Sequence, residues 1–193
     1  MSKKLVSAID IRPDKIICLV AQELEIVNQG KILQLIGSGI SQFSIQCLDP
    51  FSLDKDTLTE HLKEVIKKSE NEASIKIKDV YINITESVSS TYIDHFIETK
   101  NESIEDGHIK SYFKCDDFKE LYSNENIPLH SFPISYRINN SKSVSDPIGL
   151  QVENLTTRWH NIISTNEEIK KIHDSFNEID IHVKQIVLSN YAS

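Results

Sequence analysis

The first forty residues alternate between apolar and polar side chains with the period of a β-strand. This alternation covers Leu5–Ile11, Ile16–Glu23 and Ile32–Phe43, and the short turn Arg12–Asp14 separates the first two segments. Strands that are joined by short turns pair in antiparallel fashion. The chain is therefore predicted to begin with three antiparallel strands.

The pattern then changes to the period of a helix. A capping box begins at Thr57, and apolar residues at 62, 65 and 66 share one helix face, which predicts an amphipathic helix over about Thr57–Glu70. The sequence DVYINI, at Asp79–Ile84, predicts a short buried strand. A second helix is predicted after residues 164 and 165, each of which precedes a glutamate by three positions, and a last strand at His182–Leu188.

Between these outer segments lies a stretch with apolar patterns of its own. About eighty residues separate the fourth strand from the second helix, which is too long for a loop within one domain. Its predicted elements are strands at Ser89–Thr99, Leu129–Ile138 and Leu155–Ser164, and a weak helical pattern over Ser103–Leu121 that is interrupted by Gly107. We therefore predict an inserted α+β domain of strand, helix, strand and strand at 86–163, between core segments at 1–85 and 164–193.

The outer segments read as three strands, a helix, a strand, a helix and a strand. This is the order of the ribonuclease H-like half-domain that actin-like proteins use. The predicted fold class is accordingly α/β, an actin-like half-domain with a mixed sheet that is interrupted by the inserted domain.

Residues 129–150, LHSFPISYRINNSKSVSDPIGL, carry two motifs in a fixed order. The motif LHxxPxxYxI is filled by Leu129, His130, Pro133, Tyr136 and Ile138, and the motif DPxG by Asp146, Pro147 and Gly149. This arrangement resembles the actin-like bacterial cell-division protein family FtsA, in which both motifs lie in the domain inserted into the core. DVYINI is also similar to that family's S-V-Y-V-x-I, although Glu86 replaces the glycine that usually follows. The resemblance covers essentially the whole chain, and its ending VLSNYAS is similar to the family's strand and the start of the next helix.

The resemblance implies a cytoplasmic component of the division machinery at the septum. Members polymerise as actin-like filaments, link FtsZ to the membrane, and use the inserted domain for self-contact and for recruiting later division proteins. We expect the contact surface to be an exposed strand edge and helix face between Thr91 and Asn161, because an uncovered edge favours strand addition. Seven of these motif residues are the candidate interaction residues: Leu129, His130, Pro133, Tyr136, Asp146, Pro147 and Gly149.

The turn after the first strand carries the candidate cofactor site. Actin-like proteins hold ATP phosphates there with the sequence D-[IL]-G-[ST]-x-K, in which the backbone N–H groups approach the phosphates. In this chain Asp10 and Lys15 match, whereas Arg12 and Pro13 replace the glycine and the hydroxyl residue, and Asp14 adds a negative charge. Pro13 also lacks an N–H. We therefore expect no ATP and no other cofactor, although Arg12 offers a compensating cation.

Composition limits the partners further. A formal net charge of -8 and a pI near 5.4, without clustered Lys and Arg, argue against nucleic acid. No apolar run approaches the roughly 20 residues of a membrane span, and the N-terminus has no segment of signal-peptide length. Residence in the cytoplasm is expected, at the inner face of the membrane or the division site if a continuation or full-length partner exists, with no direct membrane anchor in this chain.

Catalytic and metal motifs are missing from the sequence. The seven histidines show no HxH or HxxxH spacing, the three cysteines no CxxC spacing, and no serine lies in GxSxG. Trp159 is predicted to anchor the core of the inserted domain, and Gly37 and Gly39 to mark a bulge or close packing in a strand. We expect no enzymatic activity and no metal site.

Two alternatives stay open at this point. The first alternative is that the chain is an ATP-dependent enzyme or ATPase of the same fold. The second is that it is a non-functional fragment of a longer division protein. The family's second half, with its FtsZ-binding and membrane-binding parts, would follow residue 193, so FtsZ is an expected partner only if that half exists. A lone half-domain is also expected to self-associate through exposed apolar surface.

Overall fold

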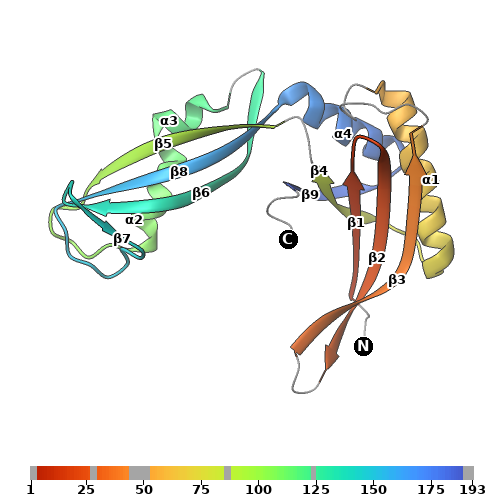
Figure 1. Cartoon of the computed structure of the whole chain (residues 1–193), viewed down its shortest axis with the longest axis horizontal. Coiled ribbons are helices and arrows are strands. Elements are labelled where there is room, and N and C mark those ends of the chain that lie inside the picture. The colour runs from red at the N-terminus through yellow and green to blue at the C-terminus, as the bar shows by residue number, and fades with distance from the viewer. Residues whose placement is uncertain (1–3, 27–29, 44–52, 85–87, 123–124, 189–193) are drawn as a thin grey trace. The chain divides into compact units, whose positions relative to one another are not determined.

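The computed structural model describes residues 4–26, 30–43, 53–84, 88–122 and 125–188 (Figure 1). The chain divides into two compact units, which we call unit 1, residues 1–87 with 167–193, and unit 2, residues 88–166. Cys47, which is one of the three cysteines, lies outside the described residues, as do Glu86 and the segment 189–193.

Unit 1 contains a five-stranded mixed sheet with the strand order β3-β2-β1-β4-β9. Strand β2 (Lys15–Ile26) pairs in antiparallel fashion with both β1 (Lys4–Ile11) and β3 (Gly30–Gln42), which confirms the predicted opening of the chain. Strands β4 (Asp79–Ile84) and β9 (His182–Leu188) continue the sheet in parallel with β1. Parallel neighbours require crossover connections, and the two helices of the unit supply them.

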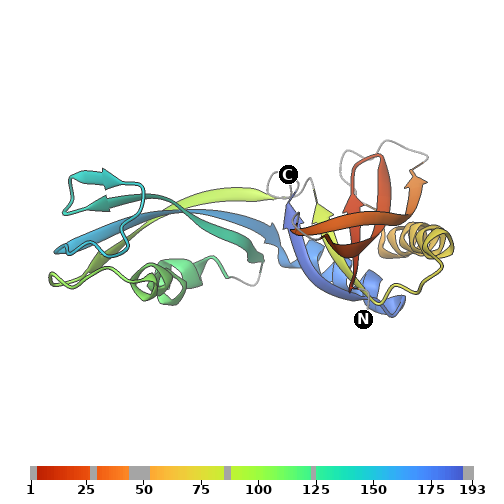
Figure 2. The same ribbon diagram turned by 90° about the horizontal axis from the view of Figure 1, so that it is seen from below.

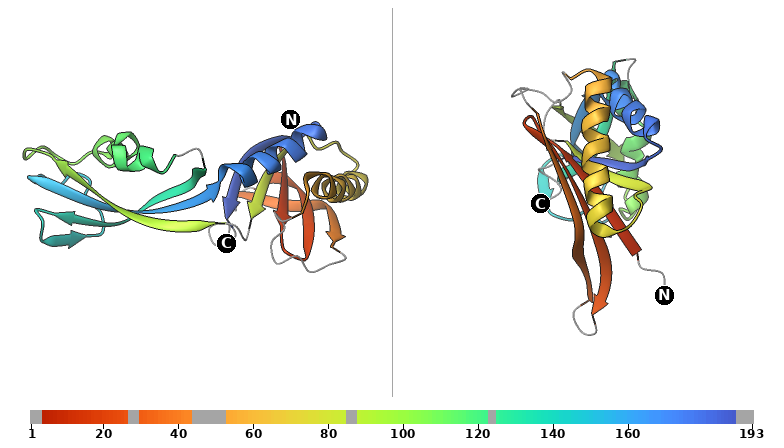
Figure 3. Two further views of the ribbon diagram at one scale, coloured as in Figure 1. Left: turned by 90° about the horizontal axis from the view of Figure 1, so that it is seen from above. Right: turned by 90° about the vertical axis from the view of Figure 1, so that its right-hand side faces the viewer.

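Helices α1 (Lys55–Ala73) and α4 (Asn166–Glu178) lie side by side on one face of this sheet. Lys55 and Lys63 of α1 place their ammonium nitrogens 2.9 and 3.4 Å from the carboxylate of Glu178 in α4. Figures 2 and 3 show the helices next to the sheet. Because both crossovers use one face, the opposite face has no helix from the described part of the chain.

The start of α1 differs from the predicted capping box. Asp54 is the N-cap residue, and its carboxylate accepts the N–H of Thr57 at 2.9 Å and the Thr57 hydroxyl at 2.8 Å. The predicted start at Thr57 is therefore wrong, because an aspartate three positions earlier already satisfies the first free N–H groups. The helix ends at Ser74, whose φ of 56° is left-handed.

Gly37 and Gly39 lie where α1 crosses β3. A Cβ atom on Gly39 would overlap the carbonyl oxygen of Val65, and one on Gly37 would come within 2.6 Å of the carbonyl oxygen of Ser69. The register of β3 against β2 also shifts between Val20 and Ala21. Both predicted explanations for these glycines, close packing and a bulge, are confirmed.

Unit 2 contains a four-stranded antiparallel sheet with the order β5-β8-β6-β7. Its strands are β5 (Ser89–Glu98), β6 (Asn126–Ile138), β7 (Lys142–Val144) and β8 (Asn154–Thr165). The short strand β7 was not predicted, since its three residues fall within the polar turn between the two family motifs. They form a strand only because β6 continues far enough to pair with them.

The helical stretch of unit 2 consists of α2 (Asp106–Lys110), the 3₁₀ helix η2 (Ser111–Lys114) and α3 (Asp116–Glu120). The predicted break at Gly107 is wrong, because that glycine lies inside α2. The chain instead becomes extended at Cys115, with φ -72° and ψ 159°, and the Cys115 sulfur accepts the N–H of Phe118 at 3.4 Å. Cys115 thus acts as the N-cap of α3.

The core of unit 2 is built around Tyr112 and Trp159. Their rings stack with centroids 4.3 Å apart and planes inclined by 9°. The Tyr112 hydroxyl donates to Oδ1 of Asn161 at 2.9 Å, and burial raises the pKa of Tyr112 to about 12. Trp159 is only 2% exposed, so its predicted place in the core is confirmed.

Candidate functional site

The turn between β1 and β2 is the candidate cofactor site of the sequence, and the contacts of its side chains can be followed one by one. The Arg12 side chain folds back so that its Nε donates to Oδ2 of Asp10 at 2.5 Å. From the neighbouring strand, Nδ2 of Asn83 donates to Oδ1 of Asp10 at 2.7 Å. Both oxygens of the Asp10 carboxylate therefore have a donor within the protein, and one of these donors is a cation.

The backbone of this turn is closed as a tight hairpin. The Arg12 N–H donates to the Lys15 carbonyl at 3.0 Å, and Pro13 has no N–H. The Lys15 ammonium lies 3.5 Å from the Asp14 carboxylate. A phosphate cradle uses several backbone N–H groups that converge on the ligand. In this turn one such group closes the hairpin and a second is missing.

The DPxG motif forms a corner in unit 2. Oδ1 of Asp146 accepts the N–H of Ile148 at 2.9 Å, and the Pro147 carbonyl accepts the N–H of Leu150 at 3.1 Å. Gly149 has a φ of +82° and donates its N–H to the Ile104 carbonyl at 2.8 Å. The motif thus ties the corner to the segment that precedes α2, which is a structural role.

The residues of the LHxxPxxYxI motif lie along β6 but do not converge on one site. Leu129 borders an open depression together with Phe113 and Tyr122, on the side of the helices. His130 stacks on Phe132 with centroids 5.6 Å apart, and burial lowers the pKa of His130.

Pro133 lies opposite Trp159 at a register shift, and Tyr136 lies opposite Thr157 and Val144. Burial, and to a lesser extent the charge of Asp146, raises the pKa of Tyr136.

The sheet face of unit 2 that is turned away from α2, η2 and α3 is rich in aromatic side chains. Tyr92 and Phe96 of the edge strand β5 are 53% and 51% exposed. Tyr92 stacks on His160 of β8 with centroids 4.8 Å apart, and in the register of the sheet His160 lies between Tyr92 and Phe132 of β6. We call Tyr92, Phe96, Phe132, Arg158 and His160 the open aromatic face.

Charged groups hold this face in place. The Arg158 guanidinium carbon lies 5.4 Å from the centre of the Tyr92 ring, and Arg158 Nε is 3.8 Å from the carboxylate of Asp94. All five residues of the open aromatic face lie within the range Thr91–Asn161 that was predicted for the contact surface, but none of them was singled out by the sequence. Every second residue of TYIDHF in β5 is aromatic or charged, and that alternation is the signal that identifies the face.

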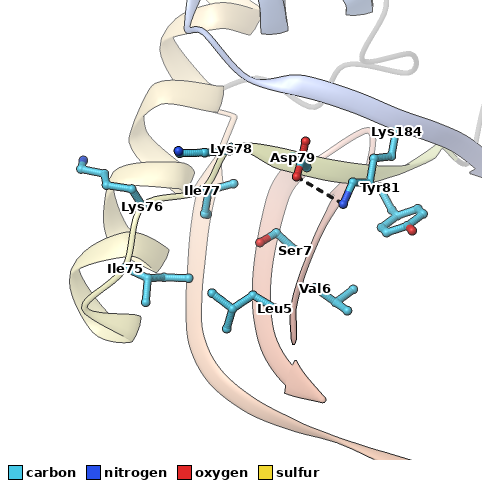
Figure 4. A pocket seen from close by; sticks show the side chains of 10 residues that line it. All are labelled: Leu5, Val6, Ser7, Ile75, Lys76, Ile77, Lys78, Asp79, Tyr81 and Lys184. Atoms are coloured by element: carbon cyan, nitrogen blue, oxygen red, sulfur yellow. Dashed lines mark ion pairs between the residues drawn. The ribbon is translucent and has the colours of Figure 1, made fainter. Parts of the chain in front are cut away.

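Unit 1 has a cavity of about 190 Å³ at the end of its sheet where β4 begins (Figure 4). Leu5 and Ser7 of β1 line one side, Ile75 and Ile77 the other, and Lys184 forms an ion pair of 3.2 Å with Asp79. The lining combines apolar side chains with this ion pair, two further lysines and the hydroxyl groups of Ser7 and Tyr81. No set of acid, base and nucleophile converges among the residues that line it.

A serine, a histidine and a glutamate do meet between β3 and α1. The Ser41 hydroxyl lies 2.7 Å from Nδ1 of His61 and donates to the Glu64 carboxylate. In a catalytic triad the acid orients the imidazole, whereas here both partners contact the hydroxyl of a buried serine. This cluster therefore links β3 to α1.

Within the described residues, no group of three or more His, Cys, Asp or Glu side chains is arranged to hold a metal ion. No helix of that part of the chain has both the length and the apolar character needed to cross a bilayer.

Curated relatives of this chain are cell-division proteins. The chain is 27% identical over 198 residues to the cell division protein FtsA of Buchnera aphidicola subsp. Schizaphis graminum. This alignment covers 100% of this chain and 45% of that protein. It is 21% identical over 196 residues to FtsA of Agrobacterium fabrum, covering 98% of this chain and 44% of that protein. No family model matches. The chain thus spans less than half the length of these relatives and resembles the N-terminal part of FtsA.

Among solved structures, the chain is similar to one in a PilM-PilN type IV pilus biogenesis complex. The TM-score is 0.57 at 8% sequence identity, over 97% of this chain and 48% of that chain. At this identity the likeness shows the fold alone. It confirms the predicted class, a mixed α/β fold of the actin-like type.

Proposed function

We propose that this chain is a bacterial cell-division protein that acts by binding other proteins through unit 2. Its similarity to FtsA over the whole chain supports the division role. The observation that carries the proposal is the open aromatic face at the edge strand β5. It offers apolar contact area and, among the strands that the structure describes, a strand edge that pairs with no other strand.

The composition of this face is that of a protein-binding surface. Tyrosine, phenylalanine and arginine are enriched at protein interfaces, and tyrosine and arginine are frequent among the residues that contribute most to binding. Tyr92 and Phe96 point to the same side of β5, and Arg158 lies against Tyr92 from the neighbouring strand. The occupant we propose is another division protein or a second copy of this chain, in keeping with the inserted-domain role that the FtsA resemblance implies.

We further propose that the chain works without ATP. The Asp10 carboxylate is engaged by Arg12 and Asn83, and the Arg12 N–H closes the turn, so the groups that would meet a phosphate are already in use. The parts of FtsA that the chain does not span hold the family's second phosphate loop. In this proposal, binding to FtsZ and attachment to the membrane are functions of the second half of an FtsA-like protein. That half is either continuous with this chain or part of a full-length partner at the cytoplasmic face of the division site.

A two-hybrid screen against the division proteins of the same bacterium tests the proposed binding. The wild-type chain is expected to interact with at least one of them, and the double variant Tyr92→Glu with Phe96→Glu is expected to lose the interaction. Ile148→Glu is a matched control, because Ile148 is also exposed but lies at the DPxG corner. Equal interaction of all three forms would exclude the open aromatic face as the contact.

The main alternative, an ATP-dependent enzyme or ATPase of the same fold, is tested by isothermal titration of the purified chain with Mg-ATP. We expect no heat of binding up to millimolar ATP. Saturable binding with micromolar affinity would favour the enzyme and contradict the proposed loss of the phosphate site. A chain that neither binds ATP nor interacts in the two-hybrid screen would favour the non-functional fragment.

A further inference from the structure

Strand β3 is the end strand of the unit 1 sheet, and its first half is unusually exposed for an apolar strand. It pairs with β2 on one side, and in the described strand order no strand lies on its other side. Residues 30–35 read GKILQL, and all six are exposed. Leu33 and Leu35 are 61% and 58% exposed, respectively, and Ile32 is also exposed.

Helix α1 protects only the second half of this strand. Its close contacts with β3 are at Gly37 and Gly39, after the bulge, where any side chain would collide with the helix backbone. The first half extends beyond that crossing. Edge strands in soluble proteins are usually blocked by prolines, charges or bulges, and the stretch 30–35 contains no proline and one charge, Lys31.

That single charge is already neutralised within the hairpin. The Lys31 ammonium lies 3.0 Å from the Glu23 carboxylate, and the Lys4 ammonium lies 2.9 Å from the same carboxylate. Hydrogen bonds from Lys4 and Lys31 lower the pKa of Glu23, so the group is ionised at neutral pH. Glu25, which lies opposite Lys31 in β2, supplies a second carboxylate, so the two lysines and the two glutamates together give this end of the hairpin no net charge.

We infer that residues 30–35 of β3 dock against the same residues of a second copy of this chain, as an antiparallel strand pair around a two-fold axis. A neutral, apolar edge attracts neither an acidic nor a basic peptide by its charge. A second copy of the same edge offers it matching apolar side chains and no opposing charge. If Leu33 lies at the axis, Lys31 is opposite Leu35 of the second copy and Ile32 is opposite its Gln34. No like charges then face each other across the new strand pair.

The side chains favour the same arrangement. Leu33 and Leu35 lie opposite Glu23 and Ala21 of β2, on the sheet face away from α1. In the proposed dimer, Leu33 and Leu35 of both copies would lie next to one another around the axis and form one apolar patch. Because each copy uses its single free β3 edge, the contact is isologous and closes at a dimer. This interface is separate from the open aromatic face and does not rest on the proposed division role.

Disulfide trapping tests the register directly. Leu33→Cys in the full chain is expected to form a covalent dimer on mild oxidation, because its sulfur meets its own copy across the axis. Leu19→Cys is the matched control, since Leu19 is exposed on the same sheet face but lies in β2, between two paired strands. Equal cross-linking of both variants, or of neither, would overturn the proposed strand pair.

Analytical ultracentrifugation measures the contact without a cross-link. The wild type is expected to sediment as a monomer–dimer equilibrium, and Leu33→Lys with Leu35→Lys is expected to weaken the dimer at least tenfold while leaving thermal unfolding of the monomer unchanged. Tyr92→Glu with Phe96→Glu should leave this dimer intact. A wild type that stays monomeric at 100 µM would overturn the proposal. Vesicle flotation gives a second outcome that would overturn the proposal. If the wild-type monomer floats with phosphatidylglycerol vesicles and the double lysine variant does not, the edge binds a lipid surface instead.

Discussion

Among single residues, those of the turn between β1 and β2 show what local sequence reveals and what it does not. The replacement of glycine and a hydroxyl residue by Arg12 and Pro13 is visible in six letters of sequence. The contact from Asn83 to Asp10 is not, because the two residues are 73 positions apart and meet only through the parallel pairing of β1 with β4. Local substitutions could therefore be interpreted in advance, but the engaged carboxylate could not.

Gly149 gives a prediction for the DPxG corner. Its φ of +82° is one that side-chain-bearing residues rarely adopt, although the space around it is open. Gly149→Ala is therefore expected to destabilise unit 2 by about 1 kcal/mol. Urea unfolding followed by the fluorescence of Trp159, the sole tryptophan of the chain, measures this change. Gly107→Ala is the control, since its surroundings are open and its φ is ordinary, and a similar loss in both variants would contradict the backbone explanation.

The histidines of unit 2 give a prediction for pH. Burial lowers the pKa of His95 and of His130 from the ordinary value of 6.5, so the folded state binds fewer protons than the unfolded state below that pH. The contribution of these two histidines to the free energy of unfolding is then fully present above pH 6.5, and it is lost as the pH falls towards their folded-state pKa. The urea midpoint reported by Trp159 should drop between pH 7.5 and pH 5.5. The drop should be smaller in His130→Gln, and an equal drop in both proteins would contradict the assignment.

At the scale of elements, the apolar period predicted most strands and both long helices, but their ends followed from contacts. Helix α1 starts at Lys55 because Asp54 caps it, which the stronger capping-box pattern at Thr57 obscured. In unit 2, Cys115 divides the helical stretch, because its backbone is extended and its sulfur caps the next turn. Cysteine is not among the usual N-cap residues, so the sequence pointed to Gly107 instead.

The crossing of α1 over β3 gives a prediction at this scale. A Cβ atom at position 39 has no room beneath the Val65 carbonyl, so Gly39→Ala must displace the helix and is expected to cost about 1–3 kcal/mol. Thermal unfolding followed by far-ultraviolet circular dichroism measures the loss. Ile40→Ala is the control on the exposed face of the same strand, and it is expected to change stability much less. A Gly39→Ala variant as stable as wild type would show that the close packing is not required.

At the scale of the whole molecule, the order of elements and the spacing of two motifs were enough to predict an actin-like α/β fold. The surfaces were harder to predict. The open aromatic face joins Tyr92, Phe132 and His160, which come from three strands and share a face only because of the register of the sheet. The exposed edge of β3 likewise depends on where α1 crosses, which no local pattern encodes. Motif spacing thus indicated the family resemblance, and the structure located the surfaces through which we propose that the chain acts.

The position of the chain in dividing cells shows whether unit 2 carries a role in division. A fluorescent fusion of the chain, expressed at native level in its own bacterium, is predicted to form a band at the division site. The fusion with Tyr92→Glu and Phe96→Glu is predicted to lose the band, while the Ile148→Glu fusion keeps it at equal protein abundance. Diffuse fluorescence of the wild-type fusion, or a band that persists in the double variant, would contradict a division role exerted through unit 2.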